Sequence, residues 1–225
     1  MRKLYAIIVA GGKGMRMGKD LPKQFLPIDG TPILMHTLQT FYDYDPSMTL
    51  IVVLPSDQQA YWSKLCGDYH FTVPHVVVKG GETRFHSVKN GLACVKGEGL
   101  VAVHDGVRPF VHRDTIDRCF ALAQESGTAV PVVEVVDSLR KVEDNGSKAV
   151  SRSHYRIVQT PQIFDISLLK EAYEQPYTDE FTDDASVVEA LGRKIFLTEG
   201  NRENIKITSP FDLVIAEAFL NRCTI

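Results

Sequence analysis

Short, continuous runs of apolar and β-branched residues recur along this chain, and they constrain its fold more than any other feature of the sequence. The runs are YAIIVA (5–10), LIVVLP (50–55), VPHVVV (73–78), LVAVH (100–104) and AVPVV (129–133). Continuous rather than alternating apolar runs are typical of strands that are buried on both faces, as in a parallel sheet. Residues 33–42 and 114–123 have helical spacing instead, with Asp114 as the expected N-cap of the second helix. This alternation predicts an α/β fold with a mostly parallel sheet and right-handed crossovers.

The second half of the chain departs from this pattern. Residues 134–155 are polar, and a turn signal at Asn145-Gly146 separates two short stretches that we expect to pair as a protruding β-hairpin without a core of its own. Further elements are expected as follows: helices near 165–174 and 183–191, a strand near 194–198, and a helix after Pro210. A length of 225 residues fits a single domain over 1–225, with 134–155 as a protruding arm.

Composition argues against several kinds of partner. The 25 Lys and Arg residues are outnumbered by 28 Asp and Glu, so the chain lacks the basic excess of most nucleic-acid-binding proteins. The four cysteines form no CxxC pair and have no zinc-ligand spacing. The apolar run after Met-Arg-Lys is too short for a secretion signal, and no window approaches ~20 uninterrupted apolar residues. We therefore expect a cytoplasmic protein that binds neither nucleic acid nor membranes.

A glycine-rich, cationic loop follows the first predicted strand. The stretch GGKGMRMGKDLPKQF (11–25) fails the Walker consensus at Asp20, and its glycine spacing is one residue too long for the dinucleotide fingerprint. Backbone amides of such a loop can nevertheless surround an anion, and Arg16 and Lys23 would add positive charge. Taken alone, the loop is equally compatible with a phosphate site and with a turn carrying solvated cations. The same two interpretations stay open for Lys13 and Lys19.

Polar clusters also follow two further predicted strands. One runs from Lys79 to Arg84, with Ser87 just beyond it, and the other is the stretch His104-Asp-Gly-Val-Arg-Pro. Because ligands of open α/β sheets collect at the carboxyl ends of strands, these clusters can border one crevice with the glycine loop. Asp105 beside phosphate-binding loops suits Mg²⁺, although it can also simply cap the turn that follows. Lys206, before the last helix, is by itself more typical of a solvated strand end.

Seven segments in register resemble the nucleotidyltransferases that couple a sugar or polyol phosphate to CTP, and within them the methylerythritol-phosphate cytidylyltransferase family. The segments are AGGKGMRMG with PKQF, PILMHT, GGETRFHSVKNGL, VHDGVRPF, QTPQIF, TDDASVVEALG and GNRENIKITSPFDL. The resemblance implies a single Rossmann-like nucleotidyltransferase domain that transfers a cytidylyl group from CTP to methylerythritol phosphate in non-mevalonate isoprenoid synthesis. It also implies Mg²⁺ as the cofactor and a homodimer formed through the arm.

The resemblance further implies roles for individual residues. The catalytic cations would be Arg16, Lys23, Arg152 and Lys206. The nucleotide-binding residues would be Ala10, Gly11, Gly12, Gly14, Gly81, Arg84, Ser87 and Asp105. The residues that bind the polyol phosphate would be Asp105, Arg108, Ser138, Arg152, Thr160 and Lys206. Asp105 would also hold the metal, and Arg152 would reach from the arm to the substrate phosphate of the neighbouring subunit.

Some positions depart from the usual family pattern on the acceptor side. They are Ser138 in place of threonine, Arg140 in place of lysine, Tyr155-Arg156 in place of Leu-Trp, and Gly106-Val107 in place of Ala-Ala. These changes keep a ribitol-5-phosphate cytidylyltransferase as an alternative. A non-catalytic nucleotide-binding regulator is disfavoured because the chain retains the cations that a transition state needs. A dehydrogenase is disfavoured by the glycine spacing.

Overall fold

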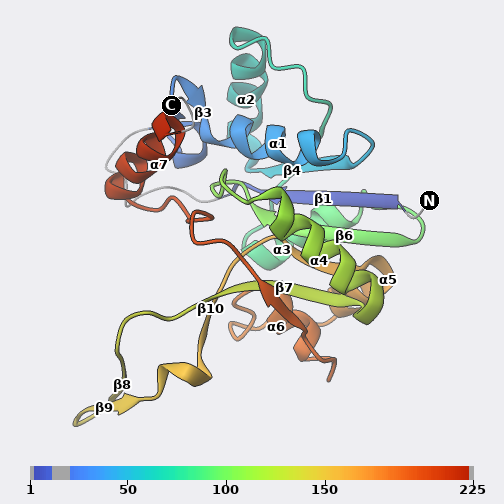
Figure 1. Cartoon of the computed structure of the whole chain (residues 1–225). Helices are drawn as coiled ribbons and strands as arrows, with labels where there is room; N and C mark the ends of the chain where they lie inside the picture. Colours follow the sequence, from blue (N-terminus) through green and yellow to red (C-terminus); the bar gives the residue numbers. More distant parts are fainter. Residues whose placement is uncertain (1–2, 12–20, 223–225) are drawn as a thin grey trace.

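A central sheet organises the molecule (Figure 1). The computed structural model describes residues 3–11 and 21–222. In this part of the chain the strand order of the sheet is β10-β7-β11-β6-β1-β4-β5, and β12 pairs with β7. The parallel half consists of β1 (Lys3–Val9), β4 (Thr49–Leu54), β5 (Val76–Lys79) and β6 (Gly99–Asp105). The other half consists of β7 (Thr128–Glu134), β10 (Arg156–Val158), β11 (Gln162–Asp165) and β12 (Leu197–Glu199). Of these, β11 runs antiparallel to both β6 and β7. The predicted mostly parallel α/β sheet is confirmed.

Helices cover both faces of the sheet. One core cluster contains residues of α1 (Ile33–Tyr44), α2 (Ser56–Asp68) and α4 (Arg113–Ser126). The opposite cluster contains residues of α3 (Arg84–Leu92), α5 (Ile166–Ala172) and α6 (Asp184–Glu189). In β1, Ala6 and Ile8 belong to the first cluster and Ile7 to the second, since successive side chains of a strand point to opposite faces. Both faces must be apolar, which explains most of the continuous apolar runs in the sequence. The run at 73–78 is an exception: β5 lies at the edge of the sheet, and Val76 and Val77 are 48% and 37% exposed.

The chain order opens a crevice beside β1. From β1 the chain continues to β4 and β5 on one side, and then to β6 on the other side of β1. Val9 and Asp105 are register partners at the carboxyl ends of β1 and β6. The loops that follow these two strands therefore separate at this point, which is where open α/β sheets bind their ligands.

A smaller cluster closes one side of this region. It contains Ile28 of β2 (Pro27–Ile28), which pairs with β3 (Thr31–Pro32) in a hairpin, together with Ile33 at the start of α1, residues of α7 (Pro210–Arg222), and Val107 and Ile207 from loops. The short 3-10 helix η2 (Lys23–Phe25) leads into this hairpin. The β2–β3 hairpin and the segment before α7 thus pack beside the end of β6.

The arm, residues 134–155, extends away from the sheet (Figure 1). Its strands β8 (Leu139–Glu143) and β9 (Gly146–Val150) pair antiparallel, and the 3-10 helix η3 (Arg152–His154) follows. The side chain of Val142 is 83% exposed, so the hairpin has no core of its own, as the sequence predicts. The turn consists of Asp144 and Asn145, one residue earlier than expected, because Gly146 at φ 136° already pairs with Glu143.

Several other expectations need correction. The N-cap of α4 is His112. Asp114 instead lies in the first turn, where its negative charge interacts favourably with the positive end of the helix dipole. Helix α2 was not predicted, because it buries only Trp62 and Leu65 and so shows little apolar periodicity in the sequence. His104, which we predicted only as part of a polar cluster, is fully buried at the end of β6. Among the described helices, none has both the length and the apolarity needed to cross a membrane.

Candidate active site

A pocket lies at the carboxyl ends of β1 and β6. Its lining includes many of the predicted site residues, namely Ala10, Gly11, Lys23, Gly81, Arg84, Ser87, Asp105 and Lys206. Gln24 and Glu82 also line it and were not predicted. The structure thus brings together residues from the first loop, from the loop before α3, from the end of β6 and from the segment before α7. Arg16, Gly12 and Gly14, together with Lys13 and Lys19, lie outside the described residues.

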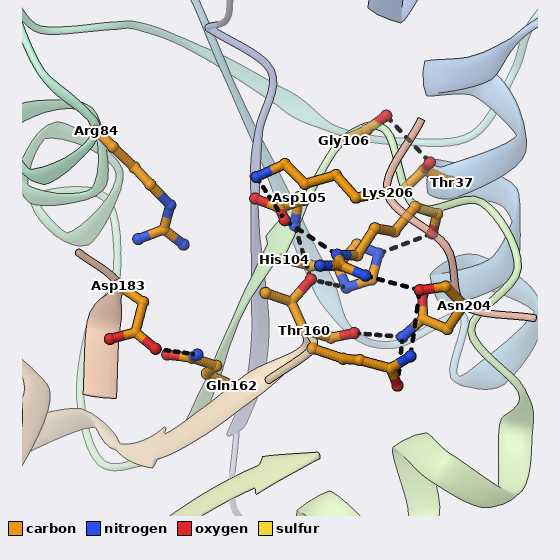
Figure 2. A network of polar contacts seen from close by, with 12 residues as sticks. Thr37, Arg84, His104, Asp105, Gly106, Thr160, Gln162, Asp183, Asn204 and Lys206 are labelled. Carbon is orange, nitrogen blue, oxygen red and sulfur yellow. Dashed lines mark hydrogen bonds and ion pairs between the residues drawn. The ribbon is translucent and has the colours of Figure 1, made fainter. Parts of the chain in front are cut away.

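Asp105 is the buried carboxylate of this pocket. Its Oδ2 atom lies 3.1 Å from Lys206 Nζ (Figure 2). The same atom lies 3.1 Å from Arg108 Nε. Burial alone would raise the pKa of Asp105, but Lys206, Arg84 and Arg108 together outweigh it and hold the pKa well below its usual range. Asp105 is therefore ionised, and it places the ammonium group of Lys206 at the end of β6.

A ring of hydrogen bonds holds Asp105 from behind. Its backbone N–H donates to Thr160 Oγ1 at 3.1 Å, Thr160 Oγ1 lies 3.0 Å from His104 Nδ1, and His104 Nε2 lies 2.9 Å from the carbonyl oxygen of Arg108. Because a carbonyl oxygen only accepts, Nε2 carries the proton, and Nδ1 accepts from the Thr160 hydroxyl. Burial lowers the pKa of His104 to about 4, so its imidazole is neutral at pH 7. Arg108 closes the ring through its bond to Asp105.

The segment that carries Lys206 is fixed to this ring. The buried side chain of Asn204 donates to the carbonyl oxygen of Thr160 at 2.8 Å (Figure 2). The backbone carbonyl oxygen of Asn204 accepts from Arg108 Nη1 at 2.7 Å. The backbone N–H of Ile207 donates to the carbonyl oxygen of Val107 at 3.0 Å. Lys206 thus projects from a backbone held on both sides.

Lys23 stands on a similarly fixed segment. The adjacent Gln24 is fully buried, and its Nε2 donates to the carbonyl oxygen of Ala10 at 2.7 Å and to Gln58 Oε1 at 2.6 Å. Phe25 is buried and stacks on Trp62 with ring centroids 6.0 Å apart. Gln24 therefore ties the Lys23 segment to the end of β1. The only sequence signal for Gln24 was its place between a predicted cation and an aromatic residue.

The loop before α3 packs tightly against that helix. The backbone N–H of Gly81 donates to Ser87 Oγ at 3.0 Å, and a Cβ atom added at Gly81 would lie only 2.3 Å from His86 Cβ. Thr83 caps α3 through its side-chain oxygen. Position 81 therefore requires glycine for a steric reason. The nearby Arg84 lines the pocket and forms a salt bridge with Asp184 of α6.

Four predicted substrate residues lie apart from the described pocket lining. Ser138 and Arg152 are exposed in the arm, where Arg152 Nη1 donates to the carbonyl oxygen of Val136. Arg108 and Thr160 lie behind Asp105, and their polar groups are engaged in the ring described above. Ser138 and Arg152 thus do not line the described pocket of their own chain, whereas Arg108 and Thr160 contact it indirectly, through Asp105.

Two departures from the family pattern have visible structural effects. Arg140 Nε donates to Ser147 Oγ at 2.8 Å, and Arg140 Nη2 donates to the Ser147 carbonyl oxygen at 2.8 Å, so this arginine bridges the two strands of the arm. A Cβ atom added at Gly106 would lie 2.9 Å from Ala10 Cβ, so the glycine lets the ends of β6 and β1 approach closely.

The acidic groups of the pocket fit a metal ion that arrives with a triphosphate. Among the described residues, no group of three or more His, Cys, Asp or Glu side chains is placed to hold a metal ion by itself. Asp105 and Glu82 are the carboxylates of the described pocket lining. Mg²⁺ commonly binds through one or two carboxylates and completes its octahedron with phosphate oxygens and water. The residues therefore suit a substrate-borne Mg²⁺ rather than a metal caged by protein alone.

Comparison with known proteins gives a consistent set of relatives. A family model for 2-C-methyl-D-erythritol 4-phosphate cytidylyltransferase matches residues 4–222. A protein of this name from Phocaeicola vulgatus is 61% identical over 216 residues, which cover 96% of this chain and 99% of the relative. The solved structure of the protein of the same name from Thermus thermophilus is 35% identical, with a TM-score of 0.77 and coverage of 98% of this chain and 100% of that one. The structure of 4-diphosphocytidyl-2C-methyl-D-erythritol synthase from Anaerococcus prevotii is 27% identical, with a TM-score of 0.83 and coverage of 98% and 97%.

Proposed function

The chain belongs to the 2-C-methyl-D-erythritol 4-phosphate cytidylyltransferase family, and from this premise we propose how its residues divide the work of the reaction. The enzyme transfers a cytidylyl group from CTP to 2-C-methyl-D-erythritol 4-phosphate, yielding CDP-methylerythritol and pyrophosphate in the non-mevalonate isoprenoid pathway. In this step an oxygen of the acceptor phosphate forms a bond to the α-phosphorus of CTP. The bond between that phosphorus and the bridging oxygen of pyrophosphate breaks.

Electrostatics is the main obstacle to this reaction. The acceptor phosphate is already an anion near neutral pH, so the reaction needs no general base, but two highly charged anions must be brought together. The observation that carries our proposal is that Lys23 and Lys206, from opposite ends of the chain, line one pocket at the ends of β1 and β6. Preorganised positive charge stabilises the developing oxyanion without reorganisation at the moment of reaction.

On the nucleotide side, we assign the triphosphate to the first loop. Ala10 and Gly11 line the pocket, and Gly12 and Gly14 continue the same loop outside the described residues. Lys23, with Arg16, stabilises the charge that develops on the α-phosphate. The nucleoside is assigned to the loop before α3, through the residues Gly81, Arg84 and Ser87.

On the acceptor side, Lys206 places the attacking phosphate beside Asp105. The contacts of Arg108 and Thr160 support an indirect contribution of these two residues, since both hold Asp105 in place. Ser138 and Arg152 act on the pocket of a second subunit, which makes the enzyme a homodimer through the arm. The exposure of the arm and its extension away from the sheet support this assignment. A cytoplasmic location stays a prediction.

Mg²⁺ is the proposed cofactor, held by Asp105 together with oxygens of CTP. When bound, it neutralises charge on the phosphate oxygens of the nucleotide. We expect a chelator to abolish turnover, and added Mg²⁺ to restore it, because the lysines of the pocket alone cannot neutralise a triphosphate. Pyrophosphate release, measured across an EDTA and Mg²⁺ titration, checks this. Full turnover in excess chelator would contradict the proposal.

The acceptor can be tested directly. Purified protein is incubated with CTP and either 2-C-methyl-D-erythritol 4-phosphate or ribitol 5-phosphate, and pyrophosphate release is measured. We expect release with the methylerythritol substrate. Release only with ribitol 5-phosphate would favour the alternative acceptor, and CTP binding without turnover on either acceptor would favour a regulator.

A further inference from the structure

Arg84 is held by a carboxylate that lies behind the pocket wall. Asp184, the first residue of α6, is fully buried. Its Oδ1 accepts from Arg84 Nη1 at 2.9 Å, and its Oδ2 accepts from Arg84 Nη2 at 2.6 Å. Two parallel N–H···O bonds between planar groups fix the orientation of the guanidinium as well as its position. The pair joins the start of α3 to the start of α6 across a long stretch of sequence.

Asp184 is itself fixed by its surroundings. The Tyr173 hydroxyl donates to Asp184 Oδ1 at 2.6 Å, and the Tyr173 ring stacks on Phe85 with centroids 4.7 Å apart. The start of α6 is fastened to β11, because Gln162 donates to Asp183 Oδ2 at 2.8 Å (Figure 2). Gln162 also accepts from the backbone N–H of Ala185 at 2.9 Å. The carboxylate that orients Arg84 is therefore in place before any ligand arrives.

This arrangement divides the positive charge of the pocket. Both cations pair with a buried carboxylate, but in different ways. Arg84 donates two hydrogen bonds to Asp184, whereas Lys206 makes one contact to Asp105 Oδ2, which Arg108 also contacts, and the Lys206 side chain is 41% exposed. The guanidinium held by two bonds therefore has less attraction left for a phosphate than the lysine that shares its carboxylate. Its remaining N–H groups still suit the neutral oxygens and ring nitrogens of a nucleoside.

We propose that Asp184 is a positioning residue for the nucleotide, which holds Arg84 so that its remaining N–H groups meet the neutral nucleoside part of CTP. This inference rests on the proposed function of the pocket and extends it to a residue outside the pocket. Asp184 acts before the chemical step, so its loss weakens CTP binding and leaves the transfer step nearly unchanged.

The test compares kinetic constants of matched variants. For Asp184→Asn we expect the KM for CTP to rise about tenfold or more, with kcat within about threefold of the parent and the KM for the acceptor unchanged. The control is Asp165→Ala, which removes the N-cap carboxylate of α5. Asp165 accepts from the backbone N–H groups of Ser167 and Leu168, so this variant should lower Tm and leave the KM for CTP unchanged. A merely structural role would lower Tm in both variants and change the KM in neither.

A double-mutant cycle shows whether Asp184 acts through Arg84. Arg84→Met should raise the KM for CTP and lower Tm, because it leaves a buried carboxylate without its cation. Adding Asp184→Asn to that variant should change the KM less than about twofold and should raise Tm. This comparison also serves if Asp184→Asn alone does not fold. An unchanged KM for CTP in Asp184→Asn, or effects of the two substitutions that simply add, would overturn the proposal.

The outcome is separable from failure of the proposed function. If the parent protein shows no turnover, the same variants are compared by calorimetric CTP binding in the presence of Mg²⁺. Weaker CTP binding in Asp184→Asn than in Asp165→Ala then supports the inference. Equal binding in these two variants counts against it.

Discussion

Lys23 and Lys206 show how single residues of this chain are placed for the role that we propose for them. Neither is an ordinary surface lysine: Lys23 is followed by two buried residues, and Lys206 is paired with a buried carboxylate. The backbone segment that carries each lysine is thus fixed in the folded protein. Part of the conformational entropy lost in placing the ammonium group is therefore lost on folding rather than during the reaction.

Replacing Lys23 tests this view of the residue. Lys23→Ala should lower kcat by a factor of about 10²–10³, corresponding to a loss of about 2.7–4 kcal/mol of transition-state stabilisation, while the KM for CTP changes little. Arg16→Ala should behave in the same way. The control is Lys89→Ala, which removes a partly exposed lysine of α3 paired with Glu174. Steady-state kinetics of the three variants suffice, and turnover within about tenfold of the parent for both Lys23→Ala and Arg16→Ala would refute the assigned roles.

His104 gives a second prediction, on stability. Its pKa is about 4 in the folded state, below the ordinary histidine value of 6.5. The unfolded chain therefore binds more protons between these two values, so the free energy of unfolding should fall as pH decreases from about 6.5 to about 4, by at most ~1.4 kcal/mol per pH unit.

Urea denaturation at a series of pH values measures this dependence. The comparison variant is His104→Asn, which has no titrating ring and should lose the slope between pH 6.5 and pH 5. Asp105 interferes little in this range. Its folded-state pKa is held below the ordinary value of 3.8, so its contribution to stability is lost mainly as the pH falls toward and below 3.8. An identical slope in parent and variant would mean that His104 is not held neutral by burial.

At the scale of elements, the site depends on how loops are packed at strand ends. The loop between β5 and α3 is closed so tightly that the Cβ position of Gly81 is already filled by His86. Such close packing fixes the backbone groups that face the pocket. It also makes neighbouring glycines unequal, since a Cβ atom at Gly80 would meet its nearest neighbour, Ser87 Oγ, at an ordinary 3.4 Å.

The two glycines form a matched pair for experiment. Gly81→Ala should displace the loop and weaken CTP binding by at least about tenfold, whereas Gly80→Ala should leave it within about twofold. Isothermal titration calorimetry with CTP and Mg²⁺ checks both variants, and circular dichroism checks that they are folded. Equal CTP affinity in the two variants would show that this loop does not border the nucleotide.

The arm is the element for which we propose a role beyond one chain. Because Arg152 lies outside the described pocket lining of its own chain, we expect it to complete the pocket of a second chain. Mixing inactive Lys23→Ala and Arg152→Ala proteins under conditions that exchange subunits should then restore activity. In a statistical mixture half of the dimers are mixed and each has one intact site, so about a quarter of the parent activity should return. Absence of recovery despite subunit exchange would contradict a shared site.

At the scale of the whole molecule, the sequence and the fold agree where burial alone decides the outcome. The runs that become β1, β4, β6 and β7 are apolar on both faces, so their pattern predicted them. The site was harder to predict because its supports join residues far apart in sequence. Nothing near Arg84 indicates Asp184, and nothing near Ala10 indicates that Gln24 binds its carbonyl oxygen. Helix α2 was missed because it buries little on its inner face.

The central claim is that cations from the two ends of the chain meet around one triphosphate. A crystal structure of the protein with CTP and Mg²⁺ measures this most directly. We predict the triphosphate at the carboxyl ends of β1 and β6, with the ammonium groups of Lys23 and Lys206 on opposite sides of the α-phosphate, each within about 4 Å of a phosphate oxygen or of the position of the attacking phosphate. A nucleotide bound elsewhere, or bound here with Lys23 and Lys206 turned away from it, would contradict the account.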